Sequence, residues 1–354
     1  MAHDINSLLK MMAEKKASDI HITTNSPVRL RIDEKLFPVD DKILKSEDTK
    51  ELAYSILSSE QIKKFESDLE LDMAFGVKDL GRFRVNVFKQ RGSVAAAIRM
   101  IPDKIWSFEE CGLPVSVALS LCKMPKGLVL LTGATGSGKS TSLASMIDWI
   151  NNNRDCHIIT VEDPIEFVHE NKKAIVNQRE LGSDTLSFAN SLKHALRQDP
   201  DVILIGELRD LETIEAALTI AETGHLVFST LHTSDCVQTV NRIIDVFPSH
   251  QQQQIRTQLS FVLIGALSQQ LIPKAKGAGR TLAMEAMIVT PAIKSLIRES
   301  KVHQIYSVIQ TSQKDGMKTM NQSLYELYQK NLITYEEALD RSTDQDDLKR
   351  IFKR

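Results

Sequence analysis

The sequence predicts an α/β protein in which a small N-terminal α+β unit precedes a larger domain on a mostly parallel sheet, followed by helices. Three observations indicate this order. Alternating apolar and polar residues recur through the first hundred residues. From Gly127, apolar strands alternate with amphipathic helices, and after Thr290 the pattern is helical.

The composition sets limits on the class of protein. A chain of 354 residues suggests two or three domains. Hydrophobic residues make up 42% and charged residues 25%, which excludes wholesale disorder. The net charge of −2 argues against a protein whose main task is to grip nucleic acid. The four cysteines match no zinc motif, and we expect them to be free thiols in a reducing compartment.

No segment reads as a signal peptide or a membrane span. The longest stretch without charge, residues 257–273, contains several Gln and Ser residues and is expected to be a buried helix. We therefore expect a cytosolic protein that reaches a membrane only through a partner.

Residues 1–100 form the predicted α+β unit. A short helix is expected over 5–15, with strands over 20–23, 28–32, 82–87 and 93–100. The strict alternation over 82–87 places three apolar side chains on one face and Arg84 on the other. The segment 101–114, which contains two prolines and a glycine, is the expected interdomain linker.

Residues 115–290 form the predicted α/β core, and residues 291–354 the helical region. Strands are expected over 128–131, 157–161, 202–205 and 225–230, and helices over 139–150, 186–198, 211–222 and 235–246. The helical region is expected to contain helices over 291–299 and 320–329 and one opened by a Thr334-x-x-Glu337 capping box.

A glycine-rich segment between the first core strand and the first core helix matches G-x-x-x-x-G-K-[ST]. It is Gly133-Ala134-Thr135-Gly136-Ser137-Gly138-Lys139-Ser140, followed by Thr141. Backbone N–H groups of such a loop, and the helix N-terminus behind it, can cradle phosphates. Lys139 would reach the β- and γ-phosphates and the Ser140 hydroxyl would ligate Mg²⁺, so we predict ATP and Mg²⁺ as ligands.

Acidic residues follow two of the predicted strands. Glu207 comes after 202–205 and is the candidate acid for the metal's water shell, or else a solvated acid at the start of the next helix. The turn 160–166 contains Glu162, Asp163 and Glu166, with Pro164 to stiffen it. It presents a carboxylate to the attacking water, or else simply places acids at a helix N-terminus.

His225 and His232 flank the strand that follows. Seven residues apart, they face opposite sides of an ideal strand, so a shared metal is not expected. Either one senses the γ-phosphate from a strand end or both are structural.

In this order and spacing, the motifs resemble the secretion ATPases of type II secretion and type IV pili. In that family they are the Walker A motif, the Asp box, an atypical Walker B motif and the His box. The resemblance covers the whole chain, and it implies a PAS-like N-terminal domain followed by a RecA-like ATPase domain. Residues 292–299, Ala-Ile-Lys-Ser-Leu-Ile-Arg-Glu, are similar to a C-terminal motif of the family's retraction enzymes, with departures at Lys294 and Ser295. Assembly enzymes carry an extra N-terminal domain and typically a four-cysteine zinc motif, and this sequence shows neither.

The resemblance also implies roles for individual residues. Glu166 would activate the attacking water and Glu207 would be the acid associated with Mg²⁺. His225 and His232 would sense the γ-phosphate and couple it to domain motion. The family forms ring hexamers in which N-terminal arginines complete a site, and Arg84 and Arg99 are the candidates here. Without the resemblance, both would be interpreted as solvated arginines on strands.

The function that the resemblance implies is that of a homohexameric motor. It would hydrolyse ATP, press on an inner-membrane platform protein and retract type IV pili in twitching motility, without binding nucleic acid or inserting into the membrane. An accessory or assembly ATPase of the same machinery would share this site. A nucleic-acid translocase and a non-hydrolysing scaffold are further alternatives.

Overall fold

A computed structural model describes residues 4–32, 35–78, 80–101 and 104–353. The chain divides into two compact units, Met1–Lys104 and Ile105–Arg354, each described here by itself. The connection between the two units is shorter than the segment 101–114 that the sequence suggests as a linker. Ile101 is the last residue of a strand, and Phe108 and Leu113 are buried in the core of the second unit.

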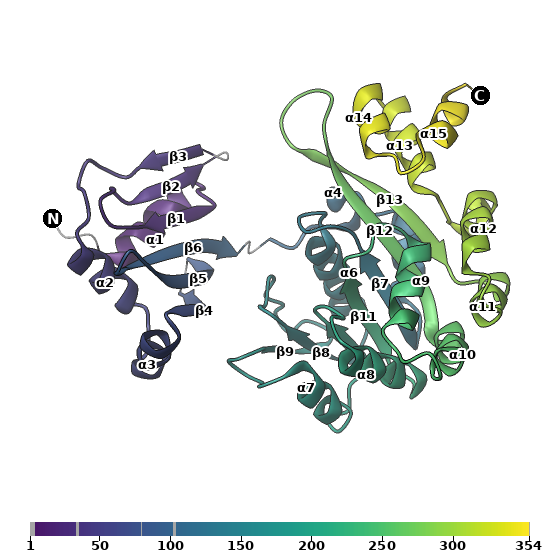
Figure 1. Ribbon diagram of the computed structural model, residues 1–354, viewed down its shortest axis with the longest axis horizontal. Helices are drawn as coiled ribbons and strands as arrows, with labels where there is room; N and C mark the ends of the chain where they lie inside the picture. Colours follow the sequence, from purple (N-terminus) through teal and green to yellow (C-terminus); the bar gives the residue numbers. More distant parts are fainter. Residues whose placement is uncertain (1–3, 33–34, 79, 102–103, 354) are drawn as a thin grey trace. The chain divides into compact units, whose positions relative to one another are not determined.

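The first unit is a six-stranded antiparallel sheet in the order β3-β2-β1-β6-β5-β4 (Figure 1). Its strands are β1 (Asp19–Ile22), β2 (Arg29–Ile32), β3 (Lys35–Pro38), β4 (Glu70–Val77), β5 (Gly81–Gln90) and β6 (Ser93–Ile101). The helices are α1 (Ile5–Glu14), α2 (Ser46–Tyr54) and α3 (Ser59–Asp68). Phe83, Val85 and Val87 of β5 are fully buried and Arg84 is exposed, which confirms the predicted faces of this strand.

The second unit is built on a seven-stranded sheet in the order β13-β12-β7-β11-β10-β8-β9. All neighbours are parallel except β12 and β13. The strands are β7 (Gly127–Thr132), β8 (His157–Glu162), β9 (Ile175–Glu180), β10 (Val202–Ile205), β11 (Leu226–Leu231), β12 (Leu263–Pro273) and β13 (Arg280–Ile288).

Helices cover both faces of this sheet, so its central strands β7, β10 and β11 are buried throughout. Leu128 and Leu130 of β7 pack into one core, and Val129 and Leu131 pack into the other. Helices α4 (Phe108–Cys111), α5 (Val115–Cys122) and α6 (Lys139–Asn153) complete the core that contains Val129 and Leu131. The core that contains Leu128 and Leu130 includes residues of α7 (Phe188–Ala195), α8 (Leu211–Glu222), α9 (Cys236–Asp245) and α10 (Gln252–Val262).

The expectation of one buried helix over 257–273 is wrong. Helix α10 ends at Val262 and β12 begins at the next residue, pairing with β7 on one side and β13 on the other. An uncharged run of this kind fits a buried strand as well as a helix, and pairing partners distant in sequence decide between them. Gly265, at a shift of the β7–β12 register, leaves no space for a Cβ beside Leu121.

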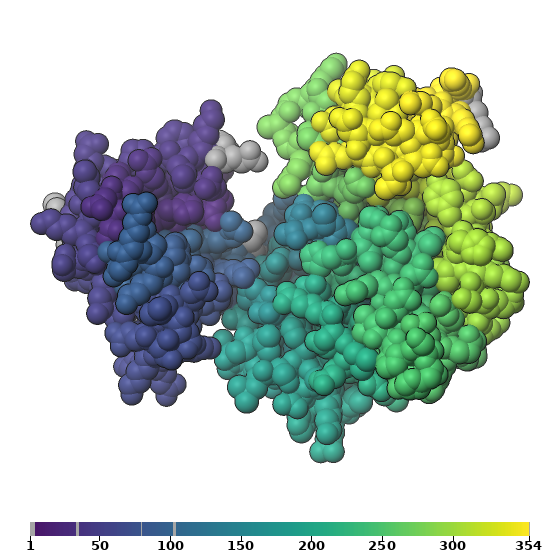
Figure 2. All heavy atoms as spheres, in the orientation of Figure 1, coloured from purple at the N-terminus to yellow at the C-terminus, as the bar shows by residue number. Residues whose placement is uncertain are grey.

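The chain closes with α11 (Pro291–Arg298), α12 (Ile305–Thr311), α13 (Met320–Gln329), α14 (Tyr335–Arg341) and α15 (Gln345–Phe352). Figure 2 shows the last three helices, in yellow, beside the β12–β13 hairpin, in green. Ile272 and Ala283 of the hairpin share a core with Leu324, Ala338 and Leu348. In the ranges that the structure describes, no helix is both long and apolar enough to cross a membrane.

Candidate nucleotide site

Four loops meet at one edge of the seven-stranded sheet. Strands β7, β11, β10 and β8 are parallel neighbours in that order, so their carboxyl ends lie together. These strand ends, with the segments that follow them, carry residues 133–141, His232, Glu207 and residues 162–166 respectively. Ligands of open α/β sheets bind at this edge.

The glycine-rich loop after β7 requires glycine at its ends. Gly133 has φ +138°, and a Cβ there would overlap the carbonyl oxygen of Gln269 and the Ser137 hydroxyl. Gly138 caps α6 with φ +91°, so the helix starts directly at Lys139. The loop therefore ends on the N-terminus of a long helix, whose free N–H groups favour an anion.

The Lys139 ammonium lies inside this loop, where it donates to the carbonyls of Gly133 (2.7 Å) and Ala134 (3.0 Å). Burial lowers the pKa of Lys139, and the negative charges of Glu207 and Glu166 counteract that shift. Both acids that the sequence singled out are therefore close enough to act electrostatically on the loop lysine.

Buried polar atoms around the loop have no hydrogen-bond partner. They are Thr132 Oγ1, Ser137 Oγ and Gln269 Oε1, and the Gln269 amide nitrogen donates to Ser142 (2.7 Å). Orphaned polar atoms in a protein interior are costly unless a ligand or water satisfies them. The hydroxyls are suitable donors to phosphate oxygens, so the residues present fit a nucleotide phosphate chain.

Glu207 is held from two sides. Its Oε2 accepts a hydrogen bond from Arg209 Nε (2.9 Å), and its Oε1 lies 3.3 Å from His232 Nε2. Arg209 also lies 3.7 Å from Asp163, so it links the loops after β10 and β8. The hydrogen bond to the Glu207 carboxylate raises the pKa of Arg209. Arg209 was not predicted from the sequence. Its position two residues after Glu207, in the loop that follows β10, could have indicated it.

The acidic turn after β8 is closed by Glu162. Its carboxylate accepts from Thr160 Oγ1 (2.6 Å) and from Gln178 Nε2 (3.2 Å), and the nearby backbone N–H of Glu166 lowers its pKa. Burial raises the pKa of Glu162. Glu166 itself is exposed at the end of the turn. Glu162 thus orients the backbone that carries Glu166, a role that the sequence did not indicate.

The two histidines are separated. His232 follows β11 at the phosphate-loop edge, beside Glu207. His225 precedes β11 at the opposite edge, where its Nδ1 lies 3.0 Å from the carbonyl of Ile220. A six-residue strand spans about 20 Å, so the structure does not bring His225 to the site in its own unit.

Arg84 and Arg99 belong to the first unit, where they are direct cross-strand neighbours on β5 and β6. Arg99 Nε donates to Asp19 (2.7 Å), and Asp19 lies 3.7 Å from Arg31 as well. Arg84 is exposed. The two candidate arginines are therefore neighbours on one face of this sheet, and their action on the nucleotide site stays a prediction.

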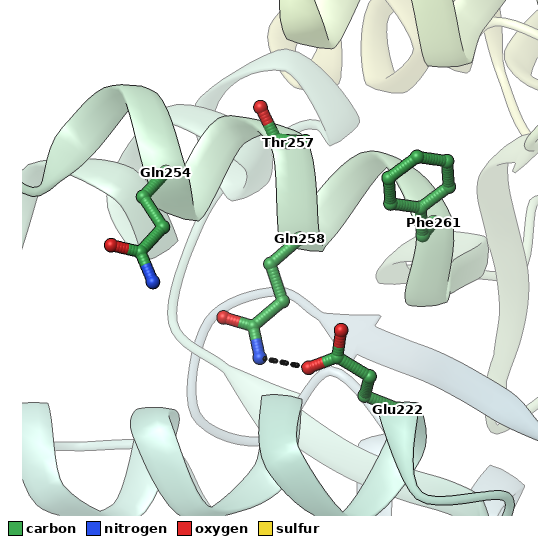
Figure 3. A pocket seen from close by; sticks show the side chains of 5 residues that line it. All are labelled: Glu222, Gln254, Thr257, Gln258 and Phe261. Atoms are coloured by element: carbon green, nitrogen blue, oxygen red, sulfur yellow. Dashed lines mark hydrogen bonds between the residues drawn. The ribbon is translucent and has the colours of Figure 1, made fainter.

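A cavity of about 330 Å³ lies on the second unit, away from the phosphate loop (Figure 3). It is formed by α8 and α10, and Gln258 donates to Glu222 across it (2.7 Å). Phe261 at its rim is 59% exposed and lies under the Arg298 guanidinium, 6.0 Å from the ring centre. Glu222 lies just before His225, at the edge of the sheet opposite the nucleotide site.

Comparison with known proteins agrees with this geometry. Residues 1–340 match the family described as type II/IV secretion system protein. The chain is 48% identical over 339 residues to the type IV pilus retraction ATPase PilT of Pseudomonas aeruginosa, covering 96% of this chain and 98% of that protein. It is 45% identical over 349 residues to a twitching motility protein of Neisseria gonorrhoeae, covering 98% and 93%.

A solved structure gives the same result. The crystal structure of the pilus retraction motor PilT with bound ADP superposes with a TM-score of 0.93 at 51% identity, covering 98% of this chain and 99% of that one. The similarity thus includes both units and the helical end. The chain belongs to the type II/IV secretion system protein family, as an ATPase of its pilus-retraction group.

Proposed function

We propose that this chain hydrolyses ATP to drive the retraction of type IV pili, and so supports twitching motility. The observation that carries the proposal is the single sheet edge where the phosphate loop, Glu207, His232 and Glu166 meet, in a chain similar over its length to retraction ATPases. The geometry of the sheet edge supports ATP hydrolysis, and the similarity to retraction ATPases supports pilus retraction as the work that hydrolysis drives.

Each loop has a distinct role in the proposed reaction. Residues 133–141 bind the phosphates through backbone N–H groups, and Lys139 leaves the loop carbonyls for the β- and γ-phosphates. Ser140 and Glu207 would hold Mg²⁺ or its water shell. When bound, the metal would supply charge neutralisation and a fixed position for the transferred phosphoryl group.

Glu166 is the proposed general base. It stands at the exposed end of a turn that Glu162 closes, so its carboxylate is free to accept a proton from the attacking water. Arg209 and His232 hold the Glu207 carboxylate on both sides, and His232 is the group placed to sense the γ-phosphate. His225, at the opposite edge, is proposed instead to act in coupling to domain motion.

The first unit is proposed to complete the site in a homohexamer. An arginine supplied across an interface is worth about 10³–10⁵ in rate in related phosphoryl-transfer reactions. Arg84 is the better candidate, because Arg99 would have to give up its bond to Asp19. Movement of the N-terminal unit about the segment near Lys104 would then gate hydrolysis.

The proposed partner is a platform protein of the inner membrane, on which the ring presses from the cytoplasm without inserting into the bilayer. An assembly or accessory ATPase of the same machinery would use the same site chemistry. The direction of the stroke must therefore be tested in cells.

The test is the number of pili per cell after deletion of the gene in its native host. We expect excess pili and lost surface motility, restored by the wild-type chain and not by Glu166→Gln, which should bind ATP and hardly turn it over. Cells without pili would identify an assembly motor. An unchanged number of pili would identify an accessory ATPase or a different transport system.

A further inference from the structure

Glu285 is a buried carboxylate that serves no part of the proposed hydrolysis. It lies on β13 with 2% of its surface exposed, although glutamate is almost never fully buried without a partner. Its Oε1 accepts from the backbone N–H of Cys236 (2.8 Å), and the N–H of Met320 lies near enough to stabilise the ionised carboxylate and lower its pKa. These are the first residues of α9 and α13.

One side chain thus lies at the first backbone N–H group of two helices, whose N-caps are Asp235 and Thr319. A carboxylate is stabilised at a helix N-terminus by the free N–H groups and by the positive end of the helix. Burial raises the pKa of Glu285 and the nearby Asp235 charge adds to that shift, whereas the bonds from Cys236 and Met320 lower it. Two helix ends are therefore fixed to one point of the sheet by a group that is expensive to bury.

The first of these helices begins next to the nucleotide site. The segment 232–235 runs from His232, beside Glu207, to Asp235, the N-cap of α9. Ser268 Oγ of β12 donates to the Ser234 carbonyl within it (2.7 Å). Because only three residues separate His232 from Cys236, a displacement of His232 acts directly on the end of α9 that Glu285 holds.

The second helix anchors the C-terminal region. The strand β13 continues its pairing to the chain before α13, with Ala286 and Lys318 bonded in both directions. Asn321, in the first turn of α13, donates to Asp347 of α15, and Tyr306 of α12 donates to the same carboxylate. The start of α13 is therefore the point from which α12 and α15 are positioned.

We propose that Glu285 is a positioning residue that transmits the state of His232 to the C-terminal helices, by holding the starts of α9 and α13 together. The proposal rests on the role of His232 given above. It assigns the helical end of the chain a part in the motor, that of moving with the nucleotide.

Hydrogen–deuterium exchange on the full chain tests this coupling. In Glu166→Gln, which should retain ATP, Mg-ATP and Mg-ADP should give different protection at residues 232–240 and at 318–326. Adding Glu285→Gln leaves one acceptor oxygen for two N–H groups. We expect the difference at 318–326 to disappear while that at 232–240 remains.

The matched control is Ser323→Ala. Ser323 accepts from the Met284 amide (3.0 Å), so this change also loosens α13 on β13 without touching α9. It should keep the exchange difference. In the otherwise wild-type chain, Glu285→Gln should lower kcat about tenfold and change KM less than twofold, and should be non-additive with His232→Ala.

An exchange difference at 318–326 that survives Glu285→Gln, or is missing from the parent, overturns the proposal. Loss of the difference in Ser323→Ala as well would show that any loosening of α13 suffices, which also overturns it. Glu285→Asp, which keeps the charge with a shorter reach, replaces the glutamine variant if that one does not fold. Absence of any ATP protection at 133–141 would instead refute the nucleotide site itself.

Discussion

Replacing Arg209 with alanine should slow ATP hydrolysis much more than it destabilises the fold. Arg209 Nε donates to Glu207 at 2.9 Å and its guanidinium lies 3.7 Å from Asp163. With 59% of its side chain exposed, such a pair contributes about 0.2–1 kcal/mol to the free energy of unfolding. In a domain of this size that corresponds to a fall in Tm of no more than about 4 °C.

The effect on turnover is larger than the effect on stability, because Arg209 fixes the position of the Glu207 carboxylate. Without Arg209 the carboxylate keeps one flanking contact, that with His232 at 3.3 Å. A misplacement of about 1 Å in such a site costs on the order of 10²-fold. We therefore expect kcat to fall about 10–100-fold, or about 1.4–2.7 kcal/mol in the activation free energy.

The assay is steady-state phosphate release at saturating Mg-ATP, with thermal unfolding followed by circular dichroism on the same samples. Arg209→Lys is the matched control. It keeps the charge and loses the planar fork, so its kcat should lie between those of the wild type and Arg209→Ala. A kcat within about threefold of wild type would refute the positioning role. A fall in Tm beyond about 8 °C would show that Arg209 acts mainly through stability.

Three further predictions concern other parts of the chain. Lys139→Ala should abolish nucleotide-dependent activity, and robust phosphate release by this variant would remove the phosphate-loop assignment. Mixing Arg84→Ala with Glu166→Gln subunits, each inactive alone, should restore activity at intermediate ratios; recovery at no ratio would exclude Arg84 as a residue that acts across subunits. His169 is buried, and its pKa is lowered to about 4 from 6.5 because burial disfavours the charged ring. The unfolded chain therefore binds a proton at His169 more tightly than the folded chain does. The stability that neutral His169 allows is fully present above pH 6.5, and it is lost as the pH falls towards 4. Between pH 7 and pH 5 the loss is about 2 kcal/mol in the free energy of unfolding. Urea unfolding of His169→Gln should show a loss smaller by that amount, and equal losses in both chains would contradict the assignment.

Elements with a strong internal period were predictable. The helix over 211–222 and the strand over 202–205 have the predicted bounds, because apolar spacing alone identifies a helix face and a buried strand. The sheet edges were not. Strands β3, β4, β9 and β13 were missed, as were α2 and α3. Strand β3 is exposed throughout, and β4 and β9 are only partly buried, so the sequences of these three strands show little apolar pattern.

The candidate site shows the same division. Motif spacing indicated the phosphate loop, Glu207 and Glu166, and the structure places all three around one sheet edge. Spacing alone could not separate the two histidines, which stand at opposite ends of β11. Nor could it show that Glu162 closes the turn before Glu166, because that bond depends on how tightly the chain turns after β8.

By itself, the sequence determined which chemistry the chain can perform. A glycine-rich loop between strand and helix is a local arrangement, so its phosphate-binding capacity is written in consecutive residues. Only the tertiary structure decided which side chains act together. The order β7-β11-β10-β8 differs from the order along the chain, and it places His232 between the phosphate loop and Glu207. In the same way, Glu285 joins two helix starts that lie 84 residues apart in sequence. Such contacts follow from long-range pairing and burial, which no local pattern encodes.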